Sequence, residues 1–453
     1  MSFKSLLLLG VLSLCACASL DRGDAAYRHQ DYARALRIWQ PQAAHGRVKA
    51  ELGLGLLYLS GQGVTRDPAQ AVLWLGKAAA QGDRVAQSTL GRLYYVGDGV
   101  AQDDQQALHW FQLAAAQGEP QAEASLGAMY ASGRGVAQDQ VEAFTWSARA
   151  ASQGDGDAEY KLALMYQDAR DMPEHEAQAL QWFRKAAGHG QAGAQFELGQ
   201  RYQFGQGVRQ DYATAAQWYR KAAEQGEARA QNSLGHLYGN GWGLPRDYTL
   251  AAQWQTKAAR QGLAPAQFNL ASRYSKGQGV PEDFHEAFRW NSQAAAQGYA
   301  PAQYSVGLAY ASGDGVDKDY AQAAVWYRKA AEQGYADACV ALGVAIMEGN
   351  GVTSDYAEAG RWLRKAAEEG DHRAQSQLGA LYELPFNRGR DLVLSHVFYS
   401  LAAASGDNNA ADSVTRIDEK LSGRQLKEAQ ALTGAWVVGT ALPLGSKTGR
   451  AGK

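Results

Sequence analysis

The sequence predicts an all-α fold, a right-handed α/α superhelical solenoid of stacked helical hairpins, and three series of residues carry that prediction. Tryptophan, glycine and tyrosine each recur every 36 residues without an insertion, which composition alone cannot produce. The tryptophans are Trp74, Trp110, Trp146, Trp182, Trp218, Trp254, Trp290, Trp326 and Trp362, with Phe398 in the next place. The glycines run from Gly46 to Gly406 and the tyrosines from Tyr58 to Tyr382, with Ile346 replacing tyrosine once. The chain is therefore predicted to contain ten 36-residue units over residues 47–406.

The first half of each unit predicts a helix followed by a tight loop. In the unit at 191–226, Ala194, Leu198 and Tyr202 are four residues apart, so they line one face of a helix. The sequence GQGV at 205–208 then ends that helix, because glycine tolerates the positive φ that such a loop requires.

The second half of each unit predicts an antiparallel helix with a capped start. Asp211 is placed to cap the first turn and Gly226 to end the last one, and an aspartate recurs at the capping place in most units. Trp218 lies on the apolar stripe and is predicted to fill the core, whereas Arg220 and Lys221 are predicted to point toward solvent. Such a hairpin cannot bury both faces alone, so the hairpins must stack on one another.

This pattern resembles the Sel-1-like repeat, a relative of the tetratricopeptide repeat. The motifs that carry the resemblance are A-x-x-x-L-G-x-x-Y at Ala230, Leu234, Gly235 and Tyr238, G-x-G-V-x-x-D at Gly313, Gly315, Val316 and Asp319, and WYRKAAEQG at 218–226 and 326–334. The resemblance covers nearly the whole mature chain. It implies a solenoid whose first helices line a concave surface that is offered to protein partners.

The first twenty residues predict a bacterial lipoprotein signal. Lys4 precedes an apolar run at 6–14 that is about half the length needed to cross a bilayer, so it indicates an export signal. The sequence LCAC at 14–17 resembles a lipobox, and the small Ala16 favours Cys17 as the lipidated residue. An ordinary secretory signal with incidental cysteines is the alternative.

The residues after Cys17 favour a location at the outer membrane. Ala18 and Ser19 follow Cys17, and no aspartate directly follows it. By resemblance to the lipoproteins of Gram-negative bacteria, the lack of an aspartate here favours sorting to the outer membrane. We therefore expect a cell-envelope lipoprotein that is held to the outer membrane by its N-terminal lipid and faces the periplasm. Cys339 would then have no intramolecular partner, so no disulfide framework is predicted.

The predicted organisation has five parts. These are a signal peptide at 1–16, the lipid anchor and N-terminal capping helices at 17–46, the repeats at 47–406, C-terminal capping helices at 407–438 and a flexible tail at 439–453. The units at 155–190 and 371–406 are degenerate, since both lack the paired loop glycines. In the first of them, His175 replaces the capping aspartate, and we interpret the change as tolerated drift, with a hinge or docking loop as the alternative.

Charge and residue spacing argue against nucleic-acid binding, metal binding and catalysis. The formal net charge is -2 and the charged residues of both signs are interspersed, so no basic footprint is present. Of the nine histidines only His45 and His189 share a place in the unit, and they lie about 40 Å apart if each unit advances the stack by about 10 Å. No phosphate-binding glycine loop occurs. The chain is predicted to have no enzymatic activity and no cofactor, and Cys339 to be a semi-buried residue, with a reactive thiol as the alternative.

Aromatic residues beside the repeated tyrosines and in the loops are candidates for partner binding. Trp242 lies in a loop place that is polar in other units, and it either anchors a contact or folds back over its own hairpin. The other candidates are Tyr95, Phe196, Phe204, Phe268 and Tyr304.

The sequence therefore predicts a lipid-anchored scaffold for protein–protein interactions in envelope assembly or secretion. Similar outer-membrane lipoproteins serve in exopolysaccharide export, which is the closest precedent that the resemblance supplies. The alternatives are binding of a host protein, binding of peptidoglycan or another glycan, and an enzymatic activity.

Overall fold

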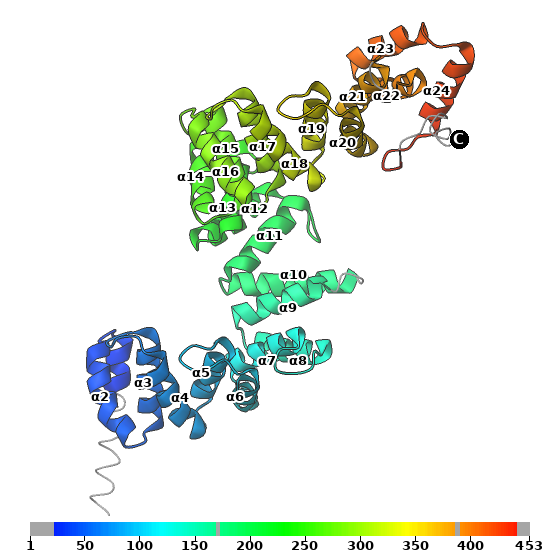
Figure 1. The fold of residues 1–453 in the computed structure, drawn as a ribbon. Coiled ribbons are helices and arrows are strands. Elements are labelled where there is room, and N and C mark those ends of the chain that lie inside the picture. Colours follow the sequence, from blue (N-terminus) through cyan, green and yellow to red (C-terminus); the bar gives the residue numbers. More distant parts are fainter. Residues whose placement is uncertain (1–21, 169–172, 386–389, 442–453) are drawn as a thin grey trace, which may run out of the picture. The chain divides into compact units, whose positions relative to one another are not determined.

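The computed structural model describes residues 22–168, 173–385 and 390–441. Within these ranges every regular element is a helix (Figure 1). The predicted signal peptide, Cys17 and the end of the predicted tail lie outside the described residues. None of the described helices combines the length and the apolar character that a bilayer-spanning helix requires.

The chain divides into two compact units, Met1–Ala222 and Ala223–Lys453, with the division inside α12 (Tyr212–Glu224). The first unit also contains α2 (Tyr32–Ala44), α3 (Val48–Ser60), α4 (Pro68–Ala80), α5 (Arg84–Val96), α6 (Asp104–Ala116), α7 (Pro120–Ser132), α8 (Gln140–Ser152), α9 (Gly156–Asp168), α10 (Pro173–Gly188) and α11 (Ala192–Phe204). The second unit contains α13 (Ala228–Asn240), α14 (Tyr248–Arg260), α15 (Ala264–Lys276), α16 (Phe284–Ala296), α17 (Ala300–Ser312), α18 (Tyr320–Glu332), α19 (Ala336–Glu348), α20 (Tyr356–Glu368), α21 (His372–Glu383), α22 (Leu392–Ala404), α23 (Asn408–Asp418) and α24 (Gly423–Ala435).

Within each unit, consecutive helices pack as hairpins and each hairpin packs on the next. In the first unit α3 pairs with α4 and α5 pairs with α6, while α4 contacts α5 between the hairpins. In the second unit α15 pairs with α16 and α17 pairs with α18 in the same way. Because each hairpin contacts its neighbours in sequence, the predicted all-α solenoid of helical hairpins is confirmed.

Aspartates cap the second helices of most hairpins, and glycines in the left-handed region end most of the first helices, as predicted. Asp103 accepts hydrogen bonds from the amides of Gln105 and Gln106 at the start of α6, both at 3.0 Å. Gly61 ends α3 in the left-handed region, at φ 71°, and its amide donates to the carbonyl of Leu57. Glycine is required at this place because other residues rarely adopt such a φ.

The structure corrects the predicted role of the tryptophans. Trp218 is only half-buried, whereas Tyr219 beside it is completely buried. The residue that follows the tryptophan is also the buried one in other units, at Leu75, Phe111, Ser147, Phe183, Gln255, Tyr327 and Leu363. Trp290 differs, because it is itself buried.

The close approach of the two helices explains this correction. A Cβ atom on Gly199 would lie 2.5 Å from the ring of Tyr219, so the residue that faces this glycine fills the hairpin core. Trp218 is one residue earlier, about 100° around the helix, and lies at the margin of the core. Arg220 and Lys221 are exposed as predicted, but Lys221 also places its ammonium group 4.3 Å from the centroid of the Trp218 ring.

A buried hydrogen-bond ladder joins neighbouring hairpins. In the first unit, Gln117 Nε2 donates to Gln87 Oε1 at 2.8 Å, and Gln87 Nε2 donates to the carbonyl of Ala79 in the preceding hairpin at 3.1 Å. In the second unit, Gln333 donates to Gln303 in the same way, at 2.7 Å. These bonds satisfy polar groups that would otherwise be buried without partners.

Cys339 interrupts this ladder. It takes the place of the buried glutamine, and it is fully buried rather than semi-buried as predicted. Burial raises the pKa of its thiol, which donates to the carbonyl of Ala331 with 3.7 Å between Sγ and the oxygen, and Lys365 Nζ also donates to that carbonyl, at 3.1 Å. A buried, protonated thiol is unreactive, so the structure favours the structural interpretation over a reactive cysteine.

The two degenerate units keep their helical hairpins. Helix α10 begins at Pro173, so His175, which stands at the place of the capping aspartate, lies inside the helix. The His175 ring contacts the Tyr166 ring edge-on, with 5.8 Å between centroids. Residues 169–172 and 386–389 of the altered loops lie outside the described residues.

The C-terminal segment packs against the last hairpin. Helices α23 and α24 both contact α22. Ser422 and Gln425 form a capping box at the start of α24, and the amide of Gly439 donates to the carbonyl of Glu368 at 2.8 Å.

Candidate protein-interaction surface

The candidate aromatic residues of the first unit differ widely in accessibility. Phe204 ends α11 and is 59% exposed. Tyr95 is half-buried, and the guanidinium of Arg134 lies 3.7 Å from the centroid of its ring. Phe196 is 4% exposed and packs against Tyr219 with 5.7 Å between ring centroids. Phe196 is therefore a core residue and cannot present its ring to a partner, which corrects the prediction.

Trp242 of the second unit packs partly over its own hairpin. It is 40% exposed, and its ring meets the edge of His236 on α13 with 5.2 Å between centroids. Burial of His236 and the nearby charge of Arg273 lower the pKa of its imidazole, so the imidazole is neutral at pH 7. Trp242 thus has an internal contact and still presents part of its ring to solvent.

Tyr304 belongs to a cluster of three tyrosines, which we call the tyrosine cluster. Its ring centroid lies 5.8 Å from that of Tyr327 on α18 and 5.6 Å from that of Tyr335, which precedes α19. One hairpin earlier, Phe268 packs in the same way against Tyr299, at 5.7 Å. Aromatic pairs at these distances are rigid and offer large apolar faces with polar edges.

Two members of the tyrosine cluster, Tyr304 and Tyr327, form one wall of a groove of about 300 Å³ between α17, α18 and α19, which we call the tyrosine groove. Its lining residues are Tyr304, Ala311, Tyr320, Ala323, Tyr327, Asp337, Val340, Ala341, Val344, Ala345, Glu348, Asn350 and Arg373. The lining from α19 is mainly aliphatic, while tyrosine hydroxyls and charged groups surround it. An apolar floor with a few polar groups is typical of sites that receive a side chain or a peptide segment.

Burial keeps the tyrosine hydroxyls of this groove protonated. Desolvation raises the pKa of Tyr327 to about 12 and also raises the pKa of Tyr304. Desolvation likewise raises the pKa of Tyr335 to about 12, with a further contribution from Asp337. These hydroxyls are therefore hydrogen-bond donors as well as acceptors at neutral pH.

Arg373 lies at the end of the groove within an ion-pair network. It bonds Asp371, which caps α21, at 2.6 Å, and it bonds Asp337 on α19. Hydrogen bonds to these carboxylates raise the pKa of Arg373. Burial would raise the pKa of Asp371, but the hydrogen bonds from Arg373 outweigh burial and lower it. Because two carboxylates neutralise Arg373, the groove is not an anion-binding site.

The sequence predicted Tyr304 but not its neighbours in this groove. Tyr335 had a signal, because GYA at 334–336 repeats GYA at 298–300 one period earlier. No sequence signal pointed to Arg373, because its bond to Asp337 joins two helices that only the fold brings together.

Among the described residues, no group of three or more histidine, cysteine, aspartate or glutamate side chains is arranged to hold a metal ion. The lining of the tyrosine groove supports recognition of a partner through shape, apolar contact and hydrogen bonds.

Stacked hairpins with a shared core and a groove across several helices define an α/α repeat scaffold. The chain matches the Sel1 repeat at residues 48–83, 85–119, 120–155, 156–191, 192–227, 228–263, 264–299, 300–335, 336–371 and 372–407. The protein belongs to the Sel1 repeat family. Members of this family generally mediate protein–protein interactions and are typically non-catalytic.

Solved structures of Sel1 repeat proteins resemble this chain. A protective antigen present in uropathogenic Escherichia coli strains, which displays an SLR fold, is 34% identical with a TM-score of 0.80, over 96% of this chain and 94% of that one. A Sel1 repeat protein from Oxalobacter formigenes is 29% identical with a TM-score of 0.45, over 80% of this chain and 93% of that one. A Sel1 repeat protein from Klebsiella pneumoniae is 25% identical with a TM-score of 0.32, over 44% of this chain and 97% of that one. No curated protein matches the sequence.

Proposed function

We propose that this protein is an exported scaffold, anchored to the cell envelope through Cys17, that binds a segment of a partner protein in the tyrosine groove. The observation that carries the proposal is the tyrosine cluster above an aliphatic floor, at a surface crossed by three helices. Tyrosine-rich apolar pockets are where binding energy concentrates in protein interfaces.

The chemistry of the groove indicates what the partner segment contains. Val340, Val344 and Ala345 give an aliphatic floor that favours an apolar side chain. The tyrosine hydroxyls around that floor can bond the backbone of an extended segment. The carboxylate of Glu348 at the rim, which accepts a hydrogen bond from Asn350 at 2.7 Å, favours a neutral or basic segment over an acidic one.

The envelope location rests on the export signal and the lipobox-like sequence at 14–17. Assembly or secretion in the envelope, including exopolysaccharide export, is the process in which such a periplasmic scaffold would act.

Binding of a host protein is a second candidate function. It is favoured by the likeness to the protective antigen of uropathogenic Escherichia coli, because an antigen that protects is accessible to a host. Protease treatment of whole cells separates the two candidates. Digestion of the chain in intact cells would favour the host-facing role, and protection would favour the periplasmic one.

Site-specific photocrosslinking in intact cells tests the groove. A photoreactive residue in place of Tyr320, a lining residue that is 42% exposed, should capture a protein partner. The matched control is Val325 on the same helix, which is 48% exposed and does not line the groove. Val344→Arg should abolish the crosslink at 320 because it places a charge over the floor. Equal capture at both positions, or capture of glycan alone, would refute the groove as the protein-binding site.

A further inference from the structure

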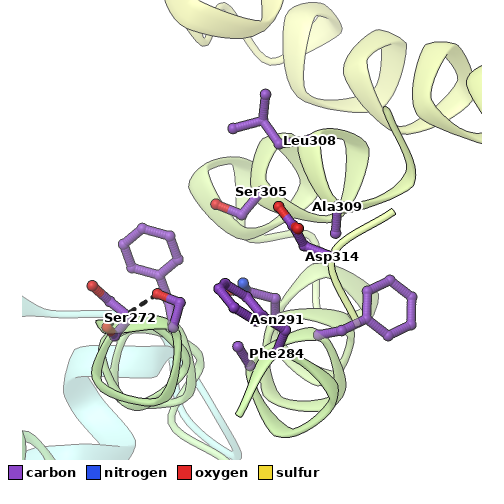
Figure 2. A pocket seen from close by; sticks show the side chains of 11 residues that line it. Ser272, Phe284, Asn291, Ser305, Leu308, Ala309 and Asp314 are labelled. Carbon is purple, nitrogen blue, oxygen red and sulfur yellow. Dashed lines mark hydrogen bonds between the residues drawn. The ribbon is translucent and has the colours of Figure 1, made fainter. Parts of the chain in front are cut away.

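A second pocket, of about 240 Å³, lies between α15, α16 and α17 (Figure 2). A water molecule takes about 30 Å³ of the liquid, so this space accepts a side chain and not merely a single water. Its apolar walls include Phe268, Phe284, Phe288 and Leu308. Asn291 lies at its centre, between Ser272 on one side and the side chains of α17 on the other (Figure 2). We call this space the Asn291 pocket.

A departure from the repeat accounts for the pocket. Asn291 stands at the place that Tyr327 and Leu363 occupy in the next two hairpins, where the side chain fills the core. The facing glycine of those hairpins is replaced here by Ala271. A short amide in place of a ring or a leucine leaves unfilled space beside α16, and a core normally avoids such space.

The pocket contains an acceptor without a donor. Asn291 Oδ1 is shielded from solvent and has no hydrogen-bond partner among the described residues. A buried polar atom in this state costs about 1–3 kcal/mol, which a ligand that donates to it would recover. The pocket therefore favours a ligand that carries a hydrogen-bond donor on an apolar or planar body.

The charge of the pocket favours a cation. Of the described residues that line it, Asp314 is the only one with a charged side chain. Asp314 lies in the loop after α17 and already accepts a hydrogen bond from Ser312 at 2.6 Å, which orients its carboxylate. Aromatic rings attract cations over their faces, so the phenylalanine walls reinforce this preference.

We propose that the Asn291 pocket binds the guanidinium group of an arginine side chain on a partner protein. A guanidinium is planar and stacks on aromatic rings, and its several donors can bond the Asp314 carboxylate and, once the Asn291 amide turns its Oδ1 toward the pocket, that oxygen as well. An ammonium group is a compact, strongly hydrated charge, so lysine fits a phenylalanine-lined pocket less well. Phe284 and Leu308, which are 39% and 43% exposed, form an apolar rim for the flanking residues of the partner.

This inference goes beyond the proposed function, because it concerns a different pocket and does not depend on the tyrosine groove. The guanidinium can be tested on the purified protein with a small probe, whereas the groove is tested by crosslinking in cells. Failure of the arginine probe to bind would therefore leave the tyrosine groove unaffected, and failure of the crosslink in cells would leave the Asn291 pocket unaffected.

The probe is N-acetyl-arginine amide, titrated into the full chain and followed by ligand-observed NMR or calorimetry. N-acetyl-citrulline amide is the matched probe, since it keeps the shape and several donors but has no charge. The arginine probe should bind at least tenfold more tightly than the citrulline and lysine analogues. Its affinity should fall as salt is raised, because Asp314 is exposed to screening. Equal binding of the arginine and citrulline probes would overturn the proposal.

Two variants locate the binding. Asn291→Phe should fill the pocket and reduce the affinity for the arginine probe at least tenfold. In another hairpin, Ala163 stands at the place of Ala271, and the buried Phe183 stands at the place of Asn291. The fold therefore accepts a phenylalanine opposite an alanine at these places. Asp314 lies in an exposed loop, so Asp314→Asn does not affect the core. This variant should bind the arginine probe several-fold more weakly and the citrulline probe with unchanged affinity.

The control is Asp98→Asn. Asp98 occupies the same loop place as Asp314 in a hairpin of the first unit, where it pairs with Arg66. Removing its charge should leave binding of the arginine probe unchanged. Arginine binding that survives both Asn291→Phe and Asp314→Asn, or that is lost equally in Asp98→Asn, would overturn the assignment to this pocket.

Discussion

Replacement of Tyr219 should destabilise its hairpin much more than replacement of Trp218 beside it. Tyr219 is completely buried, and its hydroxyl donates to Gln203 Oε1 at 2.7 Å. Tyr219→Ala leaves a cavity that costs about 3–5 kcal/mol. It also leaves the buried Gln203 without this bond, which adds about 1–3 kcal/mol. Trp218→Ala should cost only about 1–2 kcal/mol, because its ring is half-buried and the contact with Lys221 is at the surface.

Hydrogen exchange measured peptide by peptide is the right assay, because a long repeat array does not unfold in one two-state step. Since about 1.4 kcal/mol corresponds to a factor of ten, Tyr219→Ala should speed exchange in α11 and α12 by about a thousandfold or more, and Trp218→Ala by about tenfold. Tyr219→Phe keeps the ring and removes only the hydroxyl, so its cost should be about 1 kcal/mol.

The position of the effect matters as much as its size. Contacts in a solenoid are between neighbours, so protection in α4 and α5 should stay unchanged in each variant. An equal or larger loss for Trp218→Ala would refute the assignment of Tyr219 to the core. A loss spread over the whole chain would refute nearest-neighbour stacking.

Three further outcomes are expected. Burial raises the pKa of Tyr327 and Tyr335 to about 12, so the stability that their neutral forms contribute is complete below pH ~10 and is lost as the pH rises toward 12. Phenolate absorbance should show this late titration, which Tyr327→Phe should reduce; ionisation complete near pH ~10 would contradict it. Cys339 should resist alkylation by iodoacetamide until urea opens its hairpin, and rapid alkylation of the native chain would contradict its burial. Cys17→Ser should release the protein into the soluble fraction while Cys15→Ser leaves it on the membrane, and unchanged fractionation of Cys17→Ser would remove the lipid anchor.

Periodicity was sufficient to predict the hairpins, their caps and their stacking, because each of these depends on residues close together in the chain. Asp103 and Gly61 act at the helix ends where the pattern placed them. The error at Trp218 has a physical cause. Two adjacent apolar residues lie about 100° apart on a helix, and only the facing glycine decides which of them enters the core. The tryptophan is the more regular of the two in the sequence, but Tyr219 is the one that faces Gly199.

The candidate surface was predicted less well, because accessibility depends on the neighbouring helix. Phe196 and Tyr304 occupy the same place in different units, yet Phe196 is buried while Tyr304 lines a groove. Arg373 and Asp337 are 36 residues apart, so one repeat period separates them and no local motif joins them. Asn291 was overlooked because a single asparagine in a helix has no pattern of its own.

The chemistry of this protein is concentrated where the repeat changes and not where it is strict. The repeated residues give every hairpin the same core, and a surface made only of identical hairpins would offer identical weak contacts along its length. Ala271 stands where the next hairpins have glycine, and Asn291 stands where they have a large residue. These two changes open a pocket, and Asp314 gives that pocket a charge. In the next hairpins, Tyr327 and Arg373 line a groove that differs in shape and polarity. Two unlike pockets on successive hairpins of one unit would suit a partner with an apolar segment and an arginine, so binding of that partner should weaken when either pocket is filled and should weaken most when both are.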